Sequence, residues 1–203
     1  MVNLGRVDYA QALALQEELV SQLHDGNAPE QILFCSHDPL VTLGKKTLPE
    51  DLGAWQGEVY RVQRGGRATY HGPSQVICYP IIHLKKRNND IYKYLRFLEE
   101  AMVATLRTFG VLACGDPSAT GVWVESRKIA SIGIAIRRGV TFHGLAINLY
   151  FDEAAFQGIN PCGMRTDTMI SLEEILAKKV ARADFERSLQ EQLLAKLSVD
   201  NFH

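Results

Sequence analysis

One cysteine of the chain lies in a setting that suits a nucleophile. Cys162 falls between a proline and a glycine in residues 158–163, Gly-Ile-Asn-Pro-Cys-Gly, a run that predicts a tight loop presenting the sulfur instead of packing it in a strand. The other three cysteines lie in or beside apolar runs: Cys35, Cys78 and Cys114. A free cysteine in such a run is usually a small buried hydrophobe. Cys162 is therefore the candidate nucleophile, and the other three are expected in the core.

A thiol with an ordinary pKa near 8.5 needs a nearby cation or base to react as a thiolate at neutral pH. No histidine neighbours Cys162 in the sequence, so the partner must come from another segment: Lys128, His71 or His143. Lys128 opens the apolar run 129–136 and either faces water at a strand end or points into an apolar-walled site. His143, in residues 142–149, is either a satisfied core histidine or part of a binding wall. The residues alone leave these alternatives open.

A glycine-rich segment, residues 64–75, combines flexible backbone with polar side chains. Two adjacent glycines, Gly65 and Gly66, allow a sharp turn and a close approach to a ligand, and Arg64 and Arg67 add positive charge. The spacing matches neither the P-loop nor the dinucleotide-binding pattern. The segment is thus either a ligand-binding loop of another kind or a structural turn with surface arginines.

Composition limits the class of protein. The chain has 203 residues, 46% hydrophobic, with 22 basic against 23 acidic residues. This is ordinary for a folded domain, so one domain covering residues 1–203 is expected. A near-zero net charge disfavours a nucleic-acid binder. The densest basic run, residues 85–87, is interpreted as a solvated loop, with a docking patch for an acidic protein partner as the alternative. The widely spaced cysteines disfavour a structural zinc site or disulfide scaffold. No membrane span or signal peptide is recognisable, which predicts a cytoplasmic protein.

Hydrophobic periodicity and the positions of helix-capping and turn residues predict the helices and strands that would hold these residues. Helices are expected over 8–25, from an N-cap at Asp90 to about 109, from a capping box at Ser171 and Glu174, and over 184–197. Strands are expected over 32–35, 40–44, from 59, over 75–84 as a bulged or edge strand around Pro80, and as a meander over 121–124, 128–137 and 140–150. The expected fold is a single α/β (α+β) domain with a mixed, largely antiparallel sheet flanked by helices.

Five segments, taken in order, resemble the octanoyltransferases of lipoate biosynthesis, the lipoyl(octanoyl)-protein transferases of the biotin/lipoate ligase superfamily. These segments are residues 36–44, 64–75, 128–133, 143–148 and 159–163. Any one of them is a weak signal, whereas all five in the family's order make a specific one. The resemblance implies the catalytic-domain fold of biotin and lipoate protein ligases. One departure is Ser74, where the family usually has glycine; a positive φ there would strain the serine.

The resemblance also implies roles for the matching residues. Cys162 would carry the acyl group as a thioester, and Lys128 would lower the pKa of its thiol and move protons. The residues that would contact the acyl substrate form three groups: Arg64, Gly65, Gly66, Arg67, Ala68, Thr69, Tyr70 and His71; Ser131, Ile132 and Gly133; and Gly144, Leu145 and Ala146.

The implied partners are octanoyl-acyl carrier protein as donor, and lipoyl domains of 2-oxoacid dehydrogenase E2 subunits and the glycine cleavage H protein as acceptors. No cofactor or metal is implied, because transfer from a thioester to an amine is downhill. No nucleic acid or membrane partner is implied either. Three alternatives stay open. They are an ATP-dependent lipoate or biotin ligase, an acyl-carrier-protein thioesterase that uses the same cysteine, and a non-catalytic module that binds an acyl carrier.

Overall fold

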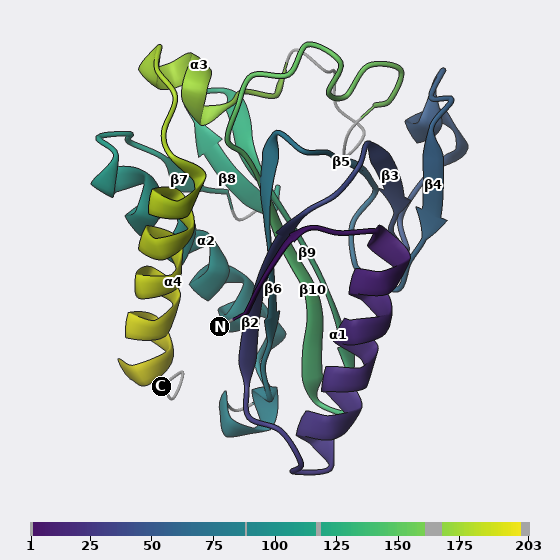
Figure 1. Cartoon of the computed structure of the whole chain (residues 1–203), viewed down its shortest axis with the longest axis vertical. Helices are drawn as coiled ribbons and strands as arrows, with labels where there is room; N and C mark the ends of the chain where they lie inside the picture. Colours follow the sequence, from purple (N-terminus) through teal and green to yellow (C-terminus); the bar gives the residue numbers. More distant parts are fainter. Residues whose placement is uncertain (1, 88, 117–118, 161–167, 200–203) are drawn as a thin grey trace.

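A computed structural model of the chain describes residues 2–87, 89–116, 119–160 and 168–199. Its main element is a seven-stranded sheet (Figure 1). In spatial order the strands are β1 (Val2–Arg6), β2 (Gln31–Ser36), β6 (Gln75–Ile81), β10 (Val140–Asn148), β9 (Arg127–Arg137), β8 (Gly121–Val124) and β7 (Cys114–Gly115). The β1–β2 pair is parallel and every other pair is antiparallel. This confirms the expected α/β class with a mixed, largely antiparallel sheet.

A second, three-stranded sheet has the order β4 (Glu58–Arg61), β3 (Leu40–Leu43) and β5 (Ala68–His71). Strand β3 pairs with β4 in parallel and with β5 in antiparallel orientation. The composition of the glycine-rich segment suggested a loop or turn. Strand β5 lies inside that segment, so part of it is a strand instead. Strands β1 and β7 were also not predicted.

The helices begin and end close to the predicted positions. They are α1 (Tyr9–His24), α2 (Ile91–Thr108), α3 (Leu172–Leu176) and α4 (Arg182–Val199), with short 3₁₀ turns η1 (Pro49–Leu52) and η2 (Leu84–Arg87). The Asp90 carboxylate accepts the N–H of Lys93 at 2.9 Å and so caps α2. The capping box of Ser171 and Glu174 opens α3 as predicted. Helix α4 begins two residues earlier than expected.

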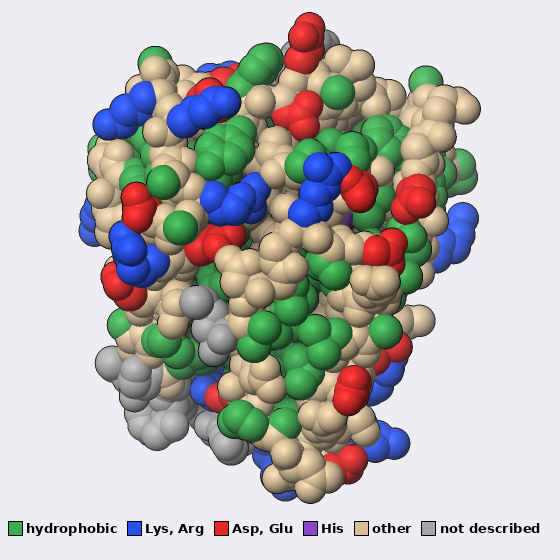
Figure 2. All heavy atoms as spheres, viewed as in Figure 1, with side chains coloured by type: hydrophobic (Ala, Val, Ile, Leu, Met, Phe, Trp, Pro, Cys, Tyr) green, Lys and Arg blue, Asp and Glu red, His purple; other side chains and the backbone are tan. Residues whose placement is uncertain are grey.

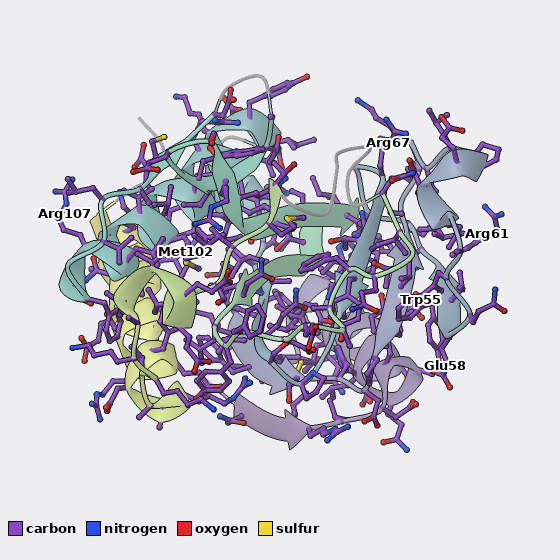
Figure 3. All side chains as sticks on the ribbon, turned by 90° about the horizontal axis from the view of Figure 1, so that it is seen from above. Trp55, Glu58, Arg61, Arg67, Met102 and Arg107 are labelled. Carbon is purple, nitrogen blue, oxygen red and sulfur yellow. The ribbon has the colours of Figure 1, made fainter. Side chains whose placement is uncertain are left out.

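The helices cover both faces of the large sheet, with α1 on one side and α2 and α4 on the other (Figure 1). Amphipathic patterning accounts for this packing. In α2, Met102 is fully buried, whereas Arg107 is exposed and points outward (Figure 3). A third cluster of buried residues lies under the small sheet and includes Tyr70, Phe156 and Ile159. The sheets and their cores thus form the fixed frame around the site.

Strand β6 is central in the large sheet, so the prediction of an edge strand was wrong. Pro80 is tolerated because regular pairing of β6 with β10 stops at Cys78. Beyond that point the Thr141 hydroxyl donates to the Pro80 carbonyl at 2.8 Å and accepts the Ile82 N–H at 3.1 Å. The Thr141 side chain therefore provides hydrogen bonds where the regular backbone pairing of β6 with β10 is interrupted at Pro80.

Two expectations about individual residues were also wrong. Cys114 is exposed in the edge strand β7, whereas Cys35 and Cys78 are buried as predicted. Arg87 is not a solvated loop residue, because it is buried and its guanidinium binds the Glu30 carboxylate at 2.7 and 3.0 Å.

On the face drawn in Figure 2, basic and acidic side chains are interspersed, in keeping with the near-zero net charge. In the part of the chain that the structure describes, no helix is long and apolar enough to cross a membrane. Among the same residues, no group of histidine, cysteine and acidic side chains is arranged to hold a metal ion.

Candidate active site

A cavity of about 590 Å³ is lined by residues of both sheets and of the first turns of α1 and α2. This volume lies within the range of about 300 to 1,000 Å³ that is usual for small-molecule sites. Its walls carry both apolar side chains, such as Ile77, Ile132 and Leu145, and a limited set of polar ones. Tyr92 and Ile91 stand at its exposed rim, 83% and 44% exposed. The cavity is suited to a mostly apolar ligand with a few polar groups.

Lys128 lines this cavity and is only 3% exposed. Its ammonium donates a hydrogen bond of 2.9 Å to the Thr120 carbonyl and stands 5.3 Å from the centre of the Trp123 ring. The alternative of a strand-end lysine facing water is thus excluded. A buried ammonium beside a cavity is a strong local charge, because little solvent screens it.

Gly121 and Glu99 surround the Lys128 side chain. Gly121 has a φ of +142°, and a Cβ added to it would stand 2.4 Å from Cε of Lys128. The Glu99 carboxylate accepts the Gly121 N–H at 2.9 Å and pairs with Arg96 at 2.5 Å. Burial raises the pKa of Glu99 above its usual range, while the Gly121 N–H, Arg96 and Lys128 act in the opposite direction. A buried carboxyl thus fixes the turn that holds the lysine.

Arg64 also lines the cavity and is almost fully buried. Its guanidinium donates to the Thr42 carbonyl at 2.7 Å and to the Thr42 hydroxyl at 3.2 and 2.8 Å. A Cβ on Gly133 would stand 2.9 Å from Cδ of Arg64, so the glycine makes room for the arginine. The Gly65 N–H donates to the Ile134 carbonyl at 2.9 Å and ties the loop to β9. Gly65 and Gly133 therefore join the small sheet to the large one.

Arg67 has a different role from Arg64. Its guanidinium donates to both carboxylate oxygens of Asp51, one of them at 3.0 Å, and Asp51 is fully buried. Burial alone would raise the pKa of Asp51, but hydrogen bonds from Arg67 and from the Leu48 and Ala68 backbone lower it. Figure 3 shows Arg67 on the same side of the molecule as Trp55, which lies between η1 and β4. The ion pair of Arg67 and Asp51 fixes η1 against the glycine-rich segment.

Three polar atoms of the cavity wall are buried and lack a hydrogen-bond partner among the described residues. They are the Thr69 hydroxyl, Nδ1 of His71 and Nε2 of His143. Burial, with further effects of His37, Arg64 and His143, lowers the pKa of His71 well below its usual range. Burial, with Arg64 and Arg137, lowers the pKa of His143 to about 3. Both rings are therefore neutral near pH 7, and His143 is not a satisfied core histidine.

Comparison with known proteins identifies the family. The model of the lipoyl protein ligase A/B catalytic domain matches residues 8–194, which is most of the chain. The chain belongs to this family. A curated octanoyltransferase of Bdellovibrio bacteriovorus is 41% identical over 210 aligned positions, covering 95% of this chain and 96% of that protein. This confirms the family that the five segments predicted.

Two solved structures show the shared fold of the lipoyl protein ligase family. A putative lipoate protein ligase of T. acidophilum aligns with a TM-score of 0.76 and 17% identity, over 98% of this chain and 85% of that one. A bipartite lipoate protein ligase, described together with its E2 lipoyl domain from Thermoplasma acidophilum, has a TM-score of 0.70 and 16% identity, over 98% and 84%.

Most residues that the resemblance marked lie around the one cavity. Those lining it are Arg64, Gly65, Gly66, Arg67, Thr69, His71, Lys128, Ser131, Ile132, Gly133, Gly144, Leu145 and Ala146. Ala68 and Tyr70 alternate with the others along β5, so their side chains pack into the core under the small sheet. Neither residue is among those that line the cavity.

Cys162 lies outside the described residues. Described residues close to it on either side contact residues of the site or their supports. The Asn160 N–H donates to the Asp51 carbonyl at 2.9 Å. Met169 forms an isolated β-bridge with Lys128. The N–H of the next residue, Ile170, donates to the Lys128 carbonyl at 3.1 Å.

Several residues of the site carried no usable signal in the sequence. Tyr9, Lys46, Tyr92 and Thr120 line the cavity, and Glu99 supports it from α2. In the sequence Glu99 looks like an ordinary charged residue of an amphipathic helix, and only the fold brings it to Gly121. Ser74 has no positive φ, so the strain expected from replacing glycine does not arise.

Proposed function

We propose that the chain transfers an octanoyl group from octanoyl-acyl carrier protein to a lysine of lipoyl domains, through an acyl thioester on Cys162. The observation that carries the proposal is the buried Lys128 ammonium in the wall of a partly apolar cavity of about 590 Å³. The 41% identical relative named octanoyltransferase supports the choice of acyl group and reaction. The E2 lipoyl domain that accompanies one structural neighbour supports the class of acceptor.

The first half of the reaction loads the enzyme. The Cys162 thiolate, stabilised by the Lys128 ammonium, attacks the carbonyl carbon of the donor thioester. A carbon–sulfur bond to Cys162 forms, the bond to the carrier sulfur breaks, and the carrier leaves as a thiol with a proton from Lys128. The products are octanoyl-Cys162, free carrier and a neutral Lys128 amine.

The second half delivers the acyl group. The amine of the acceptor lysine attacks the octanoyl-Cys162 carbonyl, and Lys128, now a base, takes the proton that this amine loses. An amide forms, the carbon–sulfur bond to Cys162 breaks, and the starting thiolate and ammonium are restored. The acceptors proposed are the lipoyl domains of 2-oxoacid dehydrogenase E2 subunits and the glycine cleavage H protein.

The apolar wall supplies binding energy for the chain. Burial of seven methylene and methyl groups contributes roughly 5 to 6 kcal/mol of gross binding, at about 0.8 kcal/mol each. One carbon of length changes affinity by only about fourfold on this scale. Selection of chain length must therefore depend on the end of the cavity.

The test is transfer without ATP. The purified protein is mixed with octanoyl-acyl carrier protein and a lipoyl domain, and the acceptor mass is followed with and without ATP. The proposal predicts octanoylated lipoyl domain in both reactions. Strict dependence on ATP would favour a ligase, and release of free octanoate with an unmodified lipoyl domain would favour a thioesterase. A carrier-binding module would leave both substrates unchanged.

A further inference from the structure

The peptide group between Thr120 and Gly121 joins a buried cation to a buried anion. Its carbonyl accepts a hydrogen bond from the Lys128 ammonium at 2.9 Å, and its N–H donates to the Glu99 carboxylate, also at 2.9 Å. The lysine and the glutamate are 3% and 2% exposed. Two hydrogen bonds and one peptide group therefore separate the opposite charges, a path of about 8 Å at most.

Two glycines make room for this arrangement. A Cβ added to Gly121 in β8 would stand 3.0 Å from Nζ of Lys128, and a Cβ added to Gly115 in β7 would stand 2.8 Å from Oε2 of Glu99. Only residues without a side chain therefore allow the ammonium and the carboxylate to lie so close to the shared peptide. Elements β7 and β8 supply the space, while α2 and β9 supply the charges.

The surroundings of Lys128 disfavour its positive charge. The lysine is buried, and the other charged side chains among the described residues that line the cavity are all basic: Lys46, Arg64 and Arg67. The two histidines of the same wall are neutral. Burial and like charges both favour the neutral form of an amine. A nearby anion is thus needed to keep the ammonium that the proposed reaction uses.

The Glu99 carboxyl has the contacts of an ionised group. One oxygen accepts the Gly121 N–H, and the other pairs with Arg96 at 2.5 Å. Burial raises the pKa of Glu99 most strongly, and Asp116 acts in the same direction. The Gly121 N–H, Arg96 and Lys128 act in the opposite direction. Each oxygen therefore has its own donor, as in a charge-assisted hydrogen-bond network.

We propose that Glu99 is a positioning residue that keeps Lys128 charged and in place through the Thr120–Gly121 peptide. This rests on the proposed function, in which Lys128 begins each cycle as an ammonium. A peptide that binds an anion at its N–H and a cation at its carbonyl is polarised by both, so each hydrogen bond strengthens the other.

Glu99 is not among the residues that line the cavity, so it acts on the reaction through Lys128. In the first half of the reaction its carboxylate stabilises the ammonium. In the second half it makes the neutral Lys128 amine a stronger base for the proton of the acceptor lysine.

The test measures the charge on Lys128 without an acyl donor. Only a neutral amine undergoes reductive methylation by formaldehyde and dimethylamine-borane, and peptide mass spectrometry gives the rate at Lys128. Glu99→Gln keeps the size of the side chain and an oxygen for the Gly121 N–H, but it removes the charge. Near pH 7, Lys128 should be methylated about tenfold faster in this variant than in the wild type. The ratio should shrink as the pH rises, because both amines then become neutral.

Two further variants serve as controls. Glu100→Gln changes the next residue of α2, whose side chain is 63% exposed and pairs with Lys196, so Lys128 should react as in the wild type. Glu99→Asp shortens the side chain but keeps the charge, so methylation of Lys128 should stay within about threefold of the wild-type rate.

The transfer reaction should show the same effect. The pH above which octanoyl transfer slows should be about one unit lower in Glu99→Gln than in the wild type. An unchanged pH dependence in this variant would contradict a role for Glu99 in the reaction.

Equal methylation rates in the wild type and Glu99→Gln would overturn the proposal. A tenfold rise in Glu99→Asp, or an acceleration in Glu99→Gln that is the same at every pH, would also overturn it, because either would indicate a loosened site and not a lost charge. Methylation needs no donor, so its outcome is separate from the proposed function, which ATP-independent transfer by the same wild-type preparation tests.

Discussion

Gly121 lies so close to Lys128 that no other residue fits beside the lysine. A Cβ at position 121 would stand 2.4 Å from Cε and 3.0 Å from Nζ of Lys128. The same glycine donates its N–H to the buried Glu99 carboxylate, so α2, β8 and the lysine form one rigid unit. The position of the ammonium is thus set by contacts on several sides.

Lys128→Met is expected to lower the transfer rate by about 10²- to 10⁴-fold, the usual contribution of an acid–base group. Methionine keeps most of the buried stem, so the thermal unfolding midpoint should change little. Single-turnover transfer of octanoyl to a lipoyl domain is the measurement. A rate close to that of the wild type, or loss of the fold, would contradict the role given to Lys128.

Gly121→Ala is expected to displace Lys128 and to reduce kcat by more than tenfold, because small errors of position in an active site are costly. Gly26→Ala is the control: it also has a positive φ, +77°, but a Cβ added there would meet nothing within 4 Å. It should lose some stability and keep its kcat. Equal kcat values for the two variants would show that contact with Lys128 does not matter.

Asp51→Asn is expected to lower the free energy of unfolding by about 2 to 3 kcal/mol, because hydrogen bonds to a buried charge are lost. The comparison is Glu50→Gln. Glu50 stands 3.7 Å from Arg67, and its side chain is 63% exposed, so its loss should cost less than about 1 kcal/mol. Urea unfolding of the two variants measures the difference. Similar losses in both would argue against Asp51 as the main partner of Arg67.

Stability is expected to fall as pH falls from 7 towards 5.5. Burial lowers the pKa of His37, His71 and His143, so in the folded state these rings take up protons at a lower pH than in the unfolded chain, which binds them below about pH 6.5. Each contributes a loss of up to about 1.4 kcal/mol per pH unit in that window. Urea unfolding at several pH values measures the slope. His143→Gln should make the slope shallower, and an unchanged slope would contradict a neutral His143.

Local signals in the sequence predicted local structure well. Asp90, the Ser171–Glu174 box and the short turns of the meander act through neighbours a few residues away, so their helices and strands could be predicted. Features that depend on distant segments could not. Strand β6 is central because β2 and β10 flank it, and the exposure of Cys114 follows from its place at a sheet edge.

The candidate site divides in the same way. Five short segments marked most of the cavity wall, because each keeps its residues together in the sequence. Glu99 and Tyr9 reach the site only through packing, and neither has a distinctive neighbourhood. The polarity of the wall at His71 also required the fold, because it depends on the hydrogen bonds between Arg64, Thr42 and His71.

The central claim is that Cys162 carries the acyl group, and intact mass spectrometry tests it most directly. The wild type, Cys162→Ala and Cys114→Ala are each mixed with octanoyl-acyl carrier protein without an acceptor, and Cys114 controls for reaction of an exposed thiol. The account predicts a mass increase of one octanoyl group in the wild type and in Cys114→Ala, and none in Cys162→Ala. An adduct that persists in Cys162→Ala, or octanoyl transfer to a lipoyl domain by that variant at the wild-type rate, would contradict it.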